Sequence, residues 1–88
     1  MALTNIMQKK SLRLVRAQAG LLVVDVQERL LPVMHEPQRV RDNAVRLTKG
    51  AAVLHVPIFV TEQYRKGIGP SVPEVAAAVP RFAPMEKL

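Results

Sequence analysis

Asp25 is the residue of this chain whose position best suits chemistry. It lies in the run 21–27, where leucine and valine give way to polar residues from Gln27 onward. A run this short, apolar and rich in valine is typical of a strand buried on both faces. Ligands of open parallel sheets lie beyond the carboxyl ends of the strands, so Asp25 would face a reactive crevice. Residue type alone leaves two roles open: a functional acid or base, or an acid that caps the following turn.

The composition limits the chemistry that these residues can do. Cysteine is absent from all 88 residues, which excludes disulfides, zinc–thiolate sites and a thiol nucleophile within this sequence. Neither glycine-rich phosphate-binding motif occurs. The two histidines have no ligand partners at suitable spacing, so we interpret His35 as a loop residue and His55 as a helix C-terminal cap. We therefore predict no metal site and no cofactor.

The elements that would position Asp25 alternate between strand and helix. Apolar residues at helical spacing from Val40 to Leu54, including Leu47, predict one buried helix face. In order, the patterns predict a strand at 21–27, a helix at 38–54, a strand at 57–61, a flexible loop at 65–70, a helix at 71–79 and the start of a strand at 85–88. The second strand delivers Glu62 and Tyr64 to the same sheet edge as Asp25.

This order predicts an α/β fold with parallel strands. Crossovers between parallel strands are right-handed, so both helices would pack on one face if the strands step in one direction. The opposite face would then carry half of the strands' apolar side chains with nothing to cover them. Each such side chain is worth about 1.5–3 kcal/mol when buried, so we interpret residues 19–88 as a partial domain.

Positive charge is concentrated at the start of the chain. The formal net charge is +6, and residues 1–16 contain four basic residues and no acid. A basic arm could bind nucleic acid or an anionic membrane, but the scarcity of aromatic residues weakens the nucleic-acid case. We interpret residues 1–18 as a solvated basic tail. Apolar runs are too short to span a membrane, and we expect a cytoplasmic protein that binds neither nucleic acid nor membrane.

Four ordered blocks of sequence resemble the isochorismatase-like hydrolases, a family of cysteine hydrolases. The resemblance covers about residues 19–88, which correspond to the N-terminal part of that family's domain. The blocks are Leu-Leu-Val-Val-Asp-Val-Gln-Glu-Arg-Leu-Leu-Pro (21–32), Val-Pro-Ile-Phe-Val-Thr-Glu-Gln-Tyr (56–64), Lys-Gly-Ile-Gly-Pro-Ser-Val-Pro-Glu (66–74) and Met-Glu-Lys (85–87).

The resemblance implies a three-layer αβα Rossmann-like fold, of which this chain would form the N-terminal half, and a triad of aspartate, lysine and cysteine. The family's aspartate falls on Asp25 and its lysine on Lys87, whereas nothing here matches the cysteine. The types fit the chemistry, because a cysteine attacks as its thiolate and needs a nearby base and a cation. The metal-binding Asp-x-His of one branch of the family has no counterpart, since the matching edge reads Thr-Glu-Gln-Tyr.

These inferences give two hypotheses for function. The first is the N-terminal part of a hydrolase that cleaves amide or vinyl-ether bonds of a small molecule and is inactive alone. Asp25 and Lys87 would be its catalytic residues, and Gln27, Glu62 and Tyr64 would lie at the substrate site. The second is a truncated, non-catalytic protein that associates with another chain through its uncovered sheet face. Homo-oligomers are compatible with both.

Overall fold

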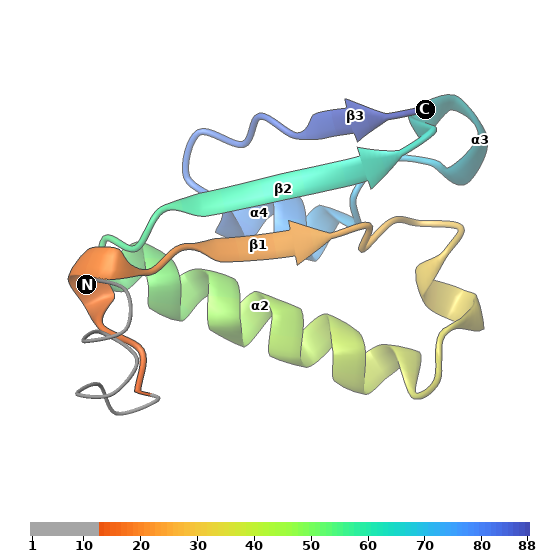
Figure 1. Ribbon diagram of the computed structural model, residues 1–88. Coiled ribbons are helices and arrows are strands. Elements are labelled where there is room, and N and C mark those ends of the chain that lie inside the picture. Colours follow the sequence, from red (N-terminus) through yellow and green to blue (C-terminus); the bar gives the residue numbers. More distant parts are fainter. Residues whose placement is uncertain (1–12) are drawn as a thin grey trace, which may run out of the picture.

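A three-stranded parallel sheet with two helices on one face forms the described part of the protein (Figure 1). The computed structural model describes residues 13–88, so the first part of the predicted basic tail, with Lys9 and Lys10, lies outside the described residues. The strands are β1 (Leu21–Val24), β2 (Ile58–Gln63) and β3 (Met85–Lys87), in the spatial order β1-β2-β3. The α/β fold class with parallel strands is confirmed.

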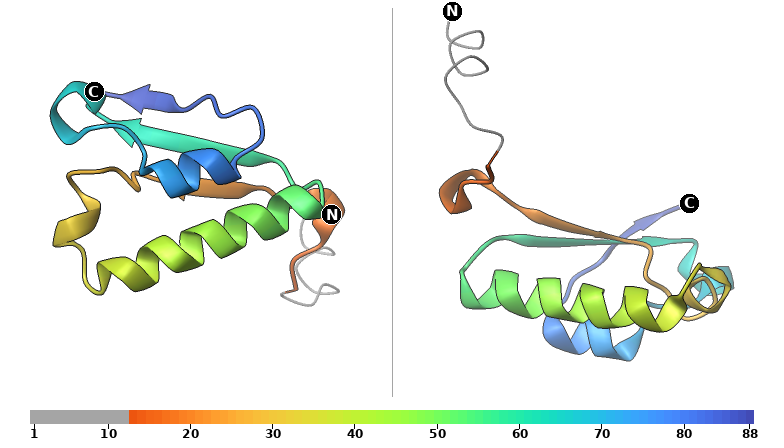
Figure 2. Two further views of the ribbon diagram at one scale, coloured as in Figure 1. Left: turned by 180° about the vertical axis from the view of Figure 1, so that it is seen from behind. Right: turned by 90° about the horizontal axis from the view of Figure 1, so that it is seen from below.

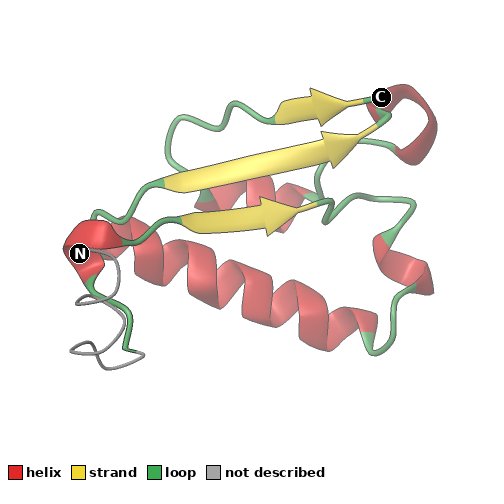
Figure 3. Ribbon diagram, viewed as in Figure 1, coloured by secondary structure: helices red, strands yellow, loops and turns green. Residues whose placement is uncertain are grey.

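Helical segments connect these strands (Figure 3). The two that pack on the sheet are α2 (Pro37–Val53) and α4 (Pro73–Ala78). Both begin with proline at the first turn, where the missing N–H costs no helical hydrogen bond. The remaining segments are short: the 3₁₀ turns η1 (Arg16–Gln18) and η2 (Leu31–Val33), and α3 (Arg65–Ile68). None of the described helices is long and apolar enough to cross a membrane.

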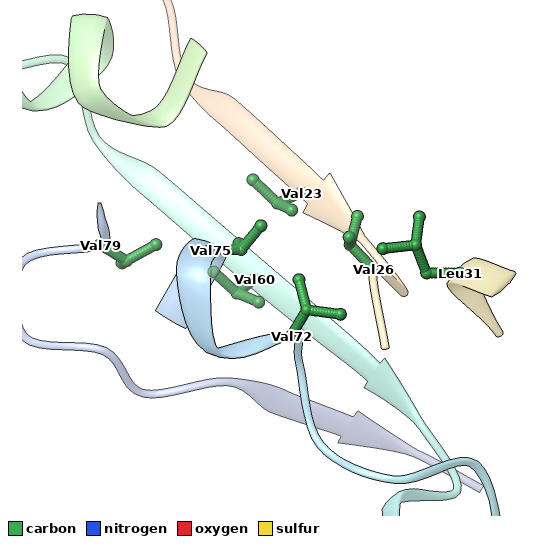
Figure 4. Close-up of a cluster of buried hydrophobic side chains, with 7 residues drawn as sticks. All are labelled: Val23, Val26, Leu31, Val60, Val72, Val75 and Val79. Carbon is green, nitrogen blue, oxygen red and sulfur yellow. The ribbon is translucent and has the colours of Figure 1, made fainter. Parts of the chain in front are cut away.

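The core lies between the sheet and its two helices. Figure 4 shows its seven buried side chains, which are almost all valine: Val23, Val26, Leu31, Val60, Val72, Val75 and Val79. Valine on the strands and valine on α4 meet there, and each buried side chain contributes about 1.5–3 kcal/mol. Figure 2 shows both helices on the same side of the strands. Two layers of an αβα arrangement are therefore present in the described residues.

The opposite side of the sheet is exposed among the described residues. Its large apolar side chains are Leu22, Val24, Phe59 and Met85, each at least half exposed. We call these four residues the uncovered face. The sequence predicted that the first strand is buried on both faces. Within residues 13–88 it is buried on one face only, because helices cover only that side of the sheet.

Four boundaries or environments differ from the sequence predictions. β1 ends at Val24 rather than Gln27, because Asp25 has a left-handed backbone (φ 55°) that cannot continue a strand. β2 continues to Gln63 rather than stopping at residue 61, because β3 pairs with its last three residues. The predicted loop at 65–70 instead contains α3. Leu47 and Leu54 are exposed on α2, and Thr48 takes a buried place on the helix.

Candidate active site

The carboxylate of Asp25 and the ammonium of Lys87 meet at the carboxyl end of the sheet. Lys87 Nζ lies 2.9 Å from Oδ1 and 3.0 Å from Oδ2 of Asp25. The hydroxyl of Thr61 donates to Oδ1 at 2.9 Å. β1 and β3 are separated by β2, so their backbones stand about 9–10 Å apart and only a long side chain can close the distance. The family resemblance predicted both Asp25 and Lys87, and the structure brings them into contact.

The backbone of Asp25 determines where its carboxylate points. In a regular strand, side chains alternate between faces, so residue 25 would follow Val23 toward the helices. The left-handed conformation of Asp25 interrupts this alternation. Its carboxylate reaches Thr61 and Lys87 instead, which belong to strand positions on the same side as Val24 and Met85. The pair therefore lies at the sheet's end, beside the uncovered face.

This pair contributes little to stability. The Asp25 side chain is 19% exposed and the Lys87 side chain 43% exposed. Ion pairs that water reaches to this extent are worth about 0–1 kcal/mol. The three short contacts therefore fix the position of the Asp25 carboxylate but add little to stability.

Gln27 holds the loop after β2 against the end of β1. The residue is fully buried. Its Nε2 donates to the carbonyl oxygens of Gln63 (3.0 Å) and Gly69 (2.7 Å), while Oε1 accepts from the Gln63 N–H at 2.7 Å. All three contacts are to backbone, so the amide side chain has no free polar atom directed at a ligand. Its substrate-binding role stays a prediction.

Glu62 is also buried, on the helix side of β2. The residue is 1% exposed, and its Oε2 accepts from both the N–H and the hydroxyl of Ser71 at 2.7 Å. Arg65 Nε lies 3.8 Å from the other oxygen. These contacts anchor the segment that leads into α4. A direct contact between Glu62 and substrate would require this loop to open, and that role stays a prediction as well.

Tyr64 stands at the start of the loop with its ring half exposed. It too has a left-handed backbone (φ 38°), which turns the chain from β2 into α3. Its ring lies over Gly67, where a Cβ atom would overlap the ring carbons. Tyr64 is thus the predicted substrate-binding residue that presents an accessible side chain near the sheet's end.

Thr61 and Ser71 are the residues that sequence reasoning missed. Thr61 was missed because a β-branched residue in a predicted strand is explained by its strand propensity and gives no sign of a polar contact. The useful signal was register: Thr61 pairs with Val24 on one side and Met85 on the other, next to both members of the charged pair. Ser71 carries no local signal, and the structure shows its role through the two hydrogen bonds to Glu62 and the bridge to Gln27.

Neither histidine joins the site. His35 is exposed and its Nε2 lies 3.3 Å from Glu36 Oε2. His55 has φ 57° and follows the end of α2, which confirms its place at the helix terminus. Residues 13–88 contain no group of three potential ligands that could hold a metal ion.

Comparison with known proteins places this chain among the isochorismatase-like proteins. Isochorismatase domain-containing protein 2 from Danio rerio is 44% identical over 57 residues, which cover 65% of this chain and 29% of the relative. Isochorismatase domain-containing protein 2A from Mus musculus is 38% identical over 65 residues, covering 74% and 32%. No family model matches. The chain spans about a third of the length of these relatives.

Solved structures agree with the sequence relatives. YcaC from Escherichia coli, described as an octameric hydrolase of unknown specificity, has a TM-score of 0.80 and 30% identity, covering 91% of this chain and 41% of that one. YcaC from Pseudomonas aeruginosa has a TM-score of 0.80 and 27% identity. MAR1 ribonuclease from Caenorhabditis elegans has a TM-score of 0.78 and 30% identity. The chain therefore belongs to the isochorismatase-like hydrolase family and spans a part of that family's domain.

Proposed function

We propose that this chain supplies the aspartate and the lysine of a cysteine hydrolase whose nucleophile lies outside these 88 residues. The observation that carries the proposal is the contact between Asp25 and Lys87 across 62 positions of sequence. Asp25 would accept the proton of an incoming thiol, and Lys87 would stabilise the thiolate and the negative charge that develops on the substrate oxygen. Thr61 would hold the carboxylate in place.

The substrate class follows from the chemistry of a thiolate nucleophile. Such a nucleophile attacks electrophilic carbon, and the family resemblance directs the proposal to amide or vinyl-ether bonds of a small molecule. YcaC from P. aeruginosa was solved with covalent acrylamide, an electrophile that combines with nucleophiles. This supports a nucleophile of the same kind in a complete domain. The E. coli homologue is described as octameric, so we propose that the complete protein forms a homo-oligomer.

A chimera tests this proposal without knowledge of the substrate. This chain replaces the matching part of P. aeruginosa YcaC, and mass spectrometry follows acrylamide labelling of the cysteines. We expect labelling of one cysteine to slow about tenfold or more in Asp25→Asn and Lys87→Met, because the thiolate loses its base and its cation. Lys66→Met, which alters a charge on the neighbouring α3, is the matched control.

Other outcomes of the chimera experiment would contradict the proposal. Labelling that is equally fast in all three variants would remove Asp25 and Lys87 from the reactive site. Turnover by the chimera is then measured with a panel of amides, vinyl ethers and one RNA oligonucleotide. The RNA is included because one structural homologue is named a ribonuclease. Cleavage of RNA alone would overturn the small-molecule assignment. Amide turnover by the 88-residue chain itself would overturn the need for an external nucleophile.

A second candidate function is association without catalysis. The uncovered face exposes four large apolar side chains on adjacent strands, and surfaces of this kind mark sites of protein association. Size-exclusion chromatography of the purified chain tests this candidate. A folded monomer at all concentrations counts against self-association through this face.

A further inference from the structure

We propose that Gln27 is a positioning residue of the pair formed by Asp25 and Lys87, because its side-chain amide stands in for the strand that β1 lacks beyond Val24. The inference rests on the proposed function and deepens it. It assigns a residue that controls how far the ammonium of Lys87 lies from the carboxylate of Asp25. Gln27 acts through the backbone of Gln63 and needs no contact with substrate.

The hydrogen-bond ladder between β1 and β2 is interrupted at Asp25. Its last backbone bond runs from the Asp25 N–H to the Thr61 carbonyl oxygen at 3.1 Å, and β2 continues past that point (Figure 1). A regular parallel ladder would go on with two further bonds, from the Gln63 N–H to the Asp25 carbonyl and from the Gln27 N–H to the Gln63 carbonyl. Neither backbone bond forms among the described residues, because left-handed Asp25 (φ 55°) turns the chain out of the strand.

The side chain of Gln27 supplies both missing partners. Its Oε1 accepts from the Gln63 N–H at 2.7 Å, and its Nε2 donates to the Gln63 carbonyl oxygen at 3.0 Å. These are the two Gln63 groups that the ladder would have used. The backbone carbonyl of Gln27 accepts from the N–H groups of Leu30 and Leu31, so its main chain belongs to the following turn. β2 therefore reaches Gln63 with both peptide groups of that residue paired, although β1 has ended.

The residue type at position 27 suits this task. A glutamine side chain has a carbonyl acceptor and an NH₂ group with two donors, and it carries no charge. Gln27 is fully buried, and its second Nε2 hydrogen is donated to the Gly69 carbonyl oxygen at 2.7 Å. Because both donors and the acceptor are used, the amide is held in one orientation. Leucine would offer neither group, and an ionised glutamate would offer acceptors alone.

The bonds from Gln27 also fix the place of Lys87. Gln63 pairs with Lys87 in the register of β2 and β3, and the Tyr64 N–H donates to the Lys87 carbonyl oxygen at 2.8 Å. β3 has three residues, all exposed, so its pairing with the end of β2 is what places it. A closed ring of contacts thus runs through Asp25, Gln27, Gln63 and Lys87. A shift of Gln63 would change the distance between the ammonium and the carboxylate.

A double-mutant cycle on the 88-residue chain is the direct test. The readout is the carboxylate carbon signal of Asp25 in NMR spectra, which we expect to shift when Lys87→Met removes the ammonium. In the Gln27→Leu background, Lys87→Met should shift that signal by less than about half as much, because the ammonium is no longer held beside the carboxylate. A role of Gln27 in stability alone would leave this response to Lys87→Met unchanged.

Ser71→Ala and Val75→Ala are the matched controls for this cycle. Ser71→Ala removes a hydroxyl that donates to Glu62, so it loosens the same loop by another contact. Val75→Ala leaves a cavity at a fully buried position of α4 and lowers stability away from the pair. In both backgrounds, the signal of Asp25 should respond to Lys87→Met as it does in the unmodified chain.

Two further measurements decide the question if Gln27→Leu does not fold, as judged by circular dichroism. Gln27→Asn then takes its place in the cycle, because an amide one methylene shorter cannot reach both groups of Gln63. The unmodified chain should also show a scalar coupling through the hydrogen bond, between the Gln63 amide nitrogen and the side-chain carbonyl carbon of Gln27. Absence of that coupling would overturn the proposal.

The chimera with P. aeruginosa YcaC separates this inference from the proposed function. Gln27→Leu should slow acrylamide labelling about threefold or more, because a displaced cation stabilises the thiolate less well. An unchanged response of Asp25 in the cycle, or labelling as fast in Gln27→Leu as in Ser71→Ala, would overturn the positioning role. Labelling that stays fast in Asp25→Asn and Lys87→Met would instead reject the proposed function, and the cycle on the 88-residue chain would still decide the role of Gln27.

Discussion

The two faces of the sheet use the same residue types for different purposes. Val23 is 7% exposed and its neighbour Val24 is 50% exposed, although both are valines of one strand. On the helix side, apolar contacts and the buried contacts of Gln27 and Glu62 hold the fold together. On the other side, the sheet's end brings Asp25, Thr61 and Lys87 into one cluster. The difference shows that residue type alone does not reveal which side of the sheet packs in the core and which side carries the charged cluster.

The largest expected effect separates the two faces directly. Val23→Asp would place an unpaired carboxyl group in the core, which costs about 2–7 kcal/mol, a large part of the total stability of a small domain, about 5–15 kcal/mol. When unfolding in urea is measured by circular dichroism, we expect Val23→Asp to show no cooperative transition. Val24→Asp should change the free energy of unfolding by less than about 1 kcal/mol. Equal stability of the two variants would mean that the faces are not distinct.

A smaller effect is expected for the buried amide on the helix side. Gln27→Leu removes the partners of two backbone carbonyls and one N–H, and should cost about 2–4 kcal/mol. Hydrogen exchange at the Gln63 amide should become faster. Gln38→Leu, at an exposed position of α2, is the control and should change stability by less than about 0.5 kcal/mol. Unchanged exchange at Gln63 would show that Gln27 does not hold the loop.

Two glutamates sharpen the comparison further. Glu62→Gln weakens the two hydrogen bonds from Ser71 to a buried charge and should cost about 1–3 kcal/mol. Glu86→Gln alters an exposed acceptor of the Arg65 N–H and should cost less than about 0.5 kcal/mol. Urea titration of both variants measures the difference. If Glu62→Gln matched Glu86→Gln, the buried contact would not anchor the loop.

The smallest effect is expected at the charged pair itself. Lys87→Met should lower the free energy of unfolding by less than about 1 kcal/mol, because water reaches both partners. The carboxylate carbon signal of Asp25 in NMR spectra should nevertheless shift. Lys49→Met, at an exposed position of α2, should leave that signal unchanged. A loss above about 2 kcal/mol in Lys87→Met would make the pair a structural element.

Much of the fold could be predicted from local patterns. The runs at 21–27 and 57–61 predicted the first two strands, and Pro37 marked the start of α2. Boundaries failed where tertiary contacts decide them. Asp25 ends β1 through a backbone conformation that no apolar pattern encodes, and α3 forms although it contains Gly67 and is followed directly by Gly69. Leu47 fits a helical stripe, yet the helix turns it toward the free edge of β1.

The candidate site was only partly predictable for a related reason. Asp25 could be found from its place at the end of a strand. Lys87 carries no local signal, and its assignment depended on family resemblance. Thr61 contacts Asp25 on another strand, and Ser71 contacts Glu62 and bridges to Gln27, so only the register of the strands and the path of the loop revealed these two residues.

The contact between Tyr64 and Gly67 has a practical consequence. The chain contains one tyrosine and no tryptophan, so its intrinsic ultraviolet emission comes from Tyr64 alone. That ring lies over Gly67, close to the carboxyl end of the sheet. Unlabelled protein therefore carries a single built-in optical reporter, whose intensity and anisotropy report on the turn after β2 and on any molecule that settles there.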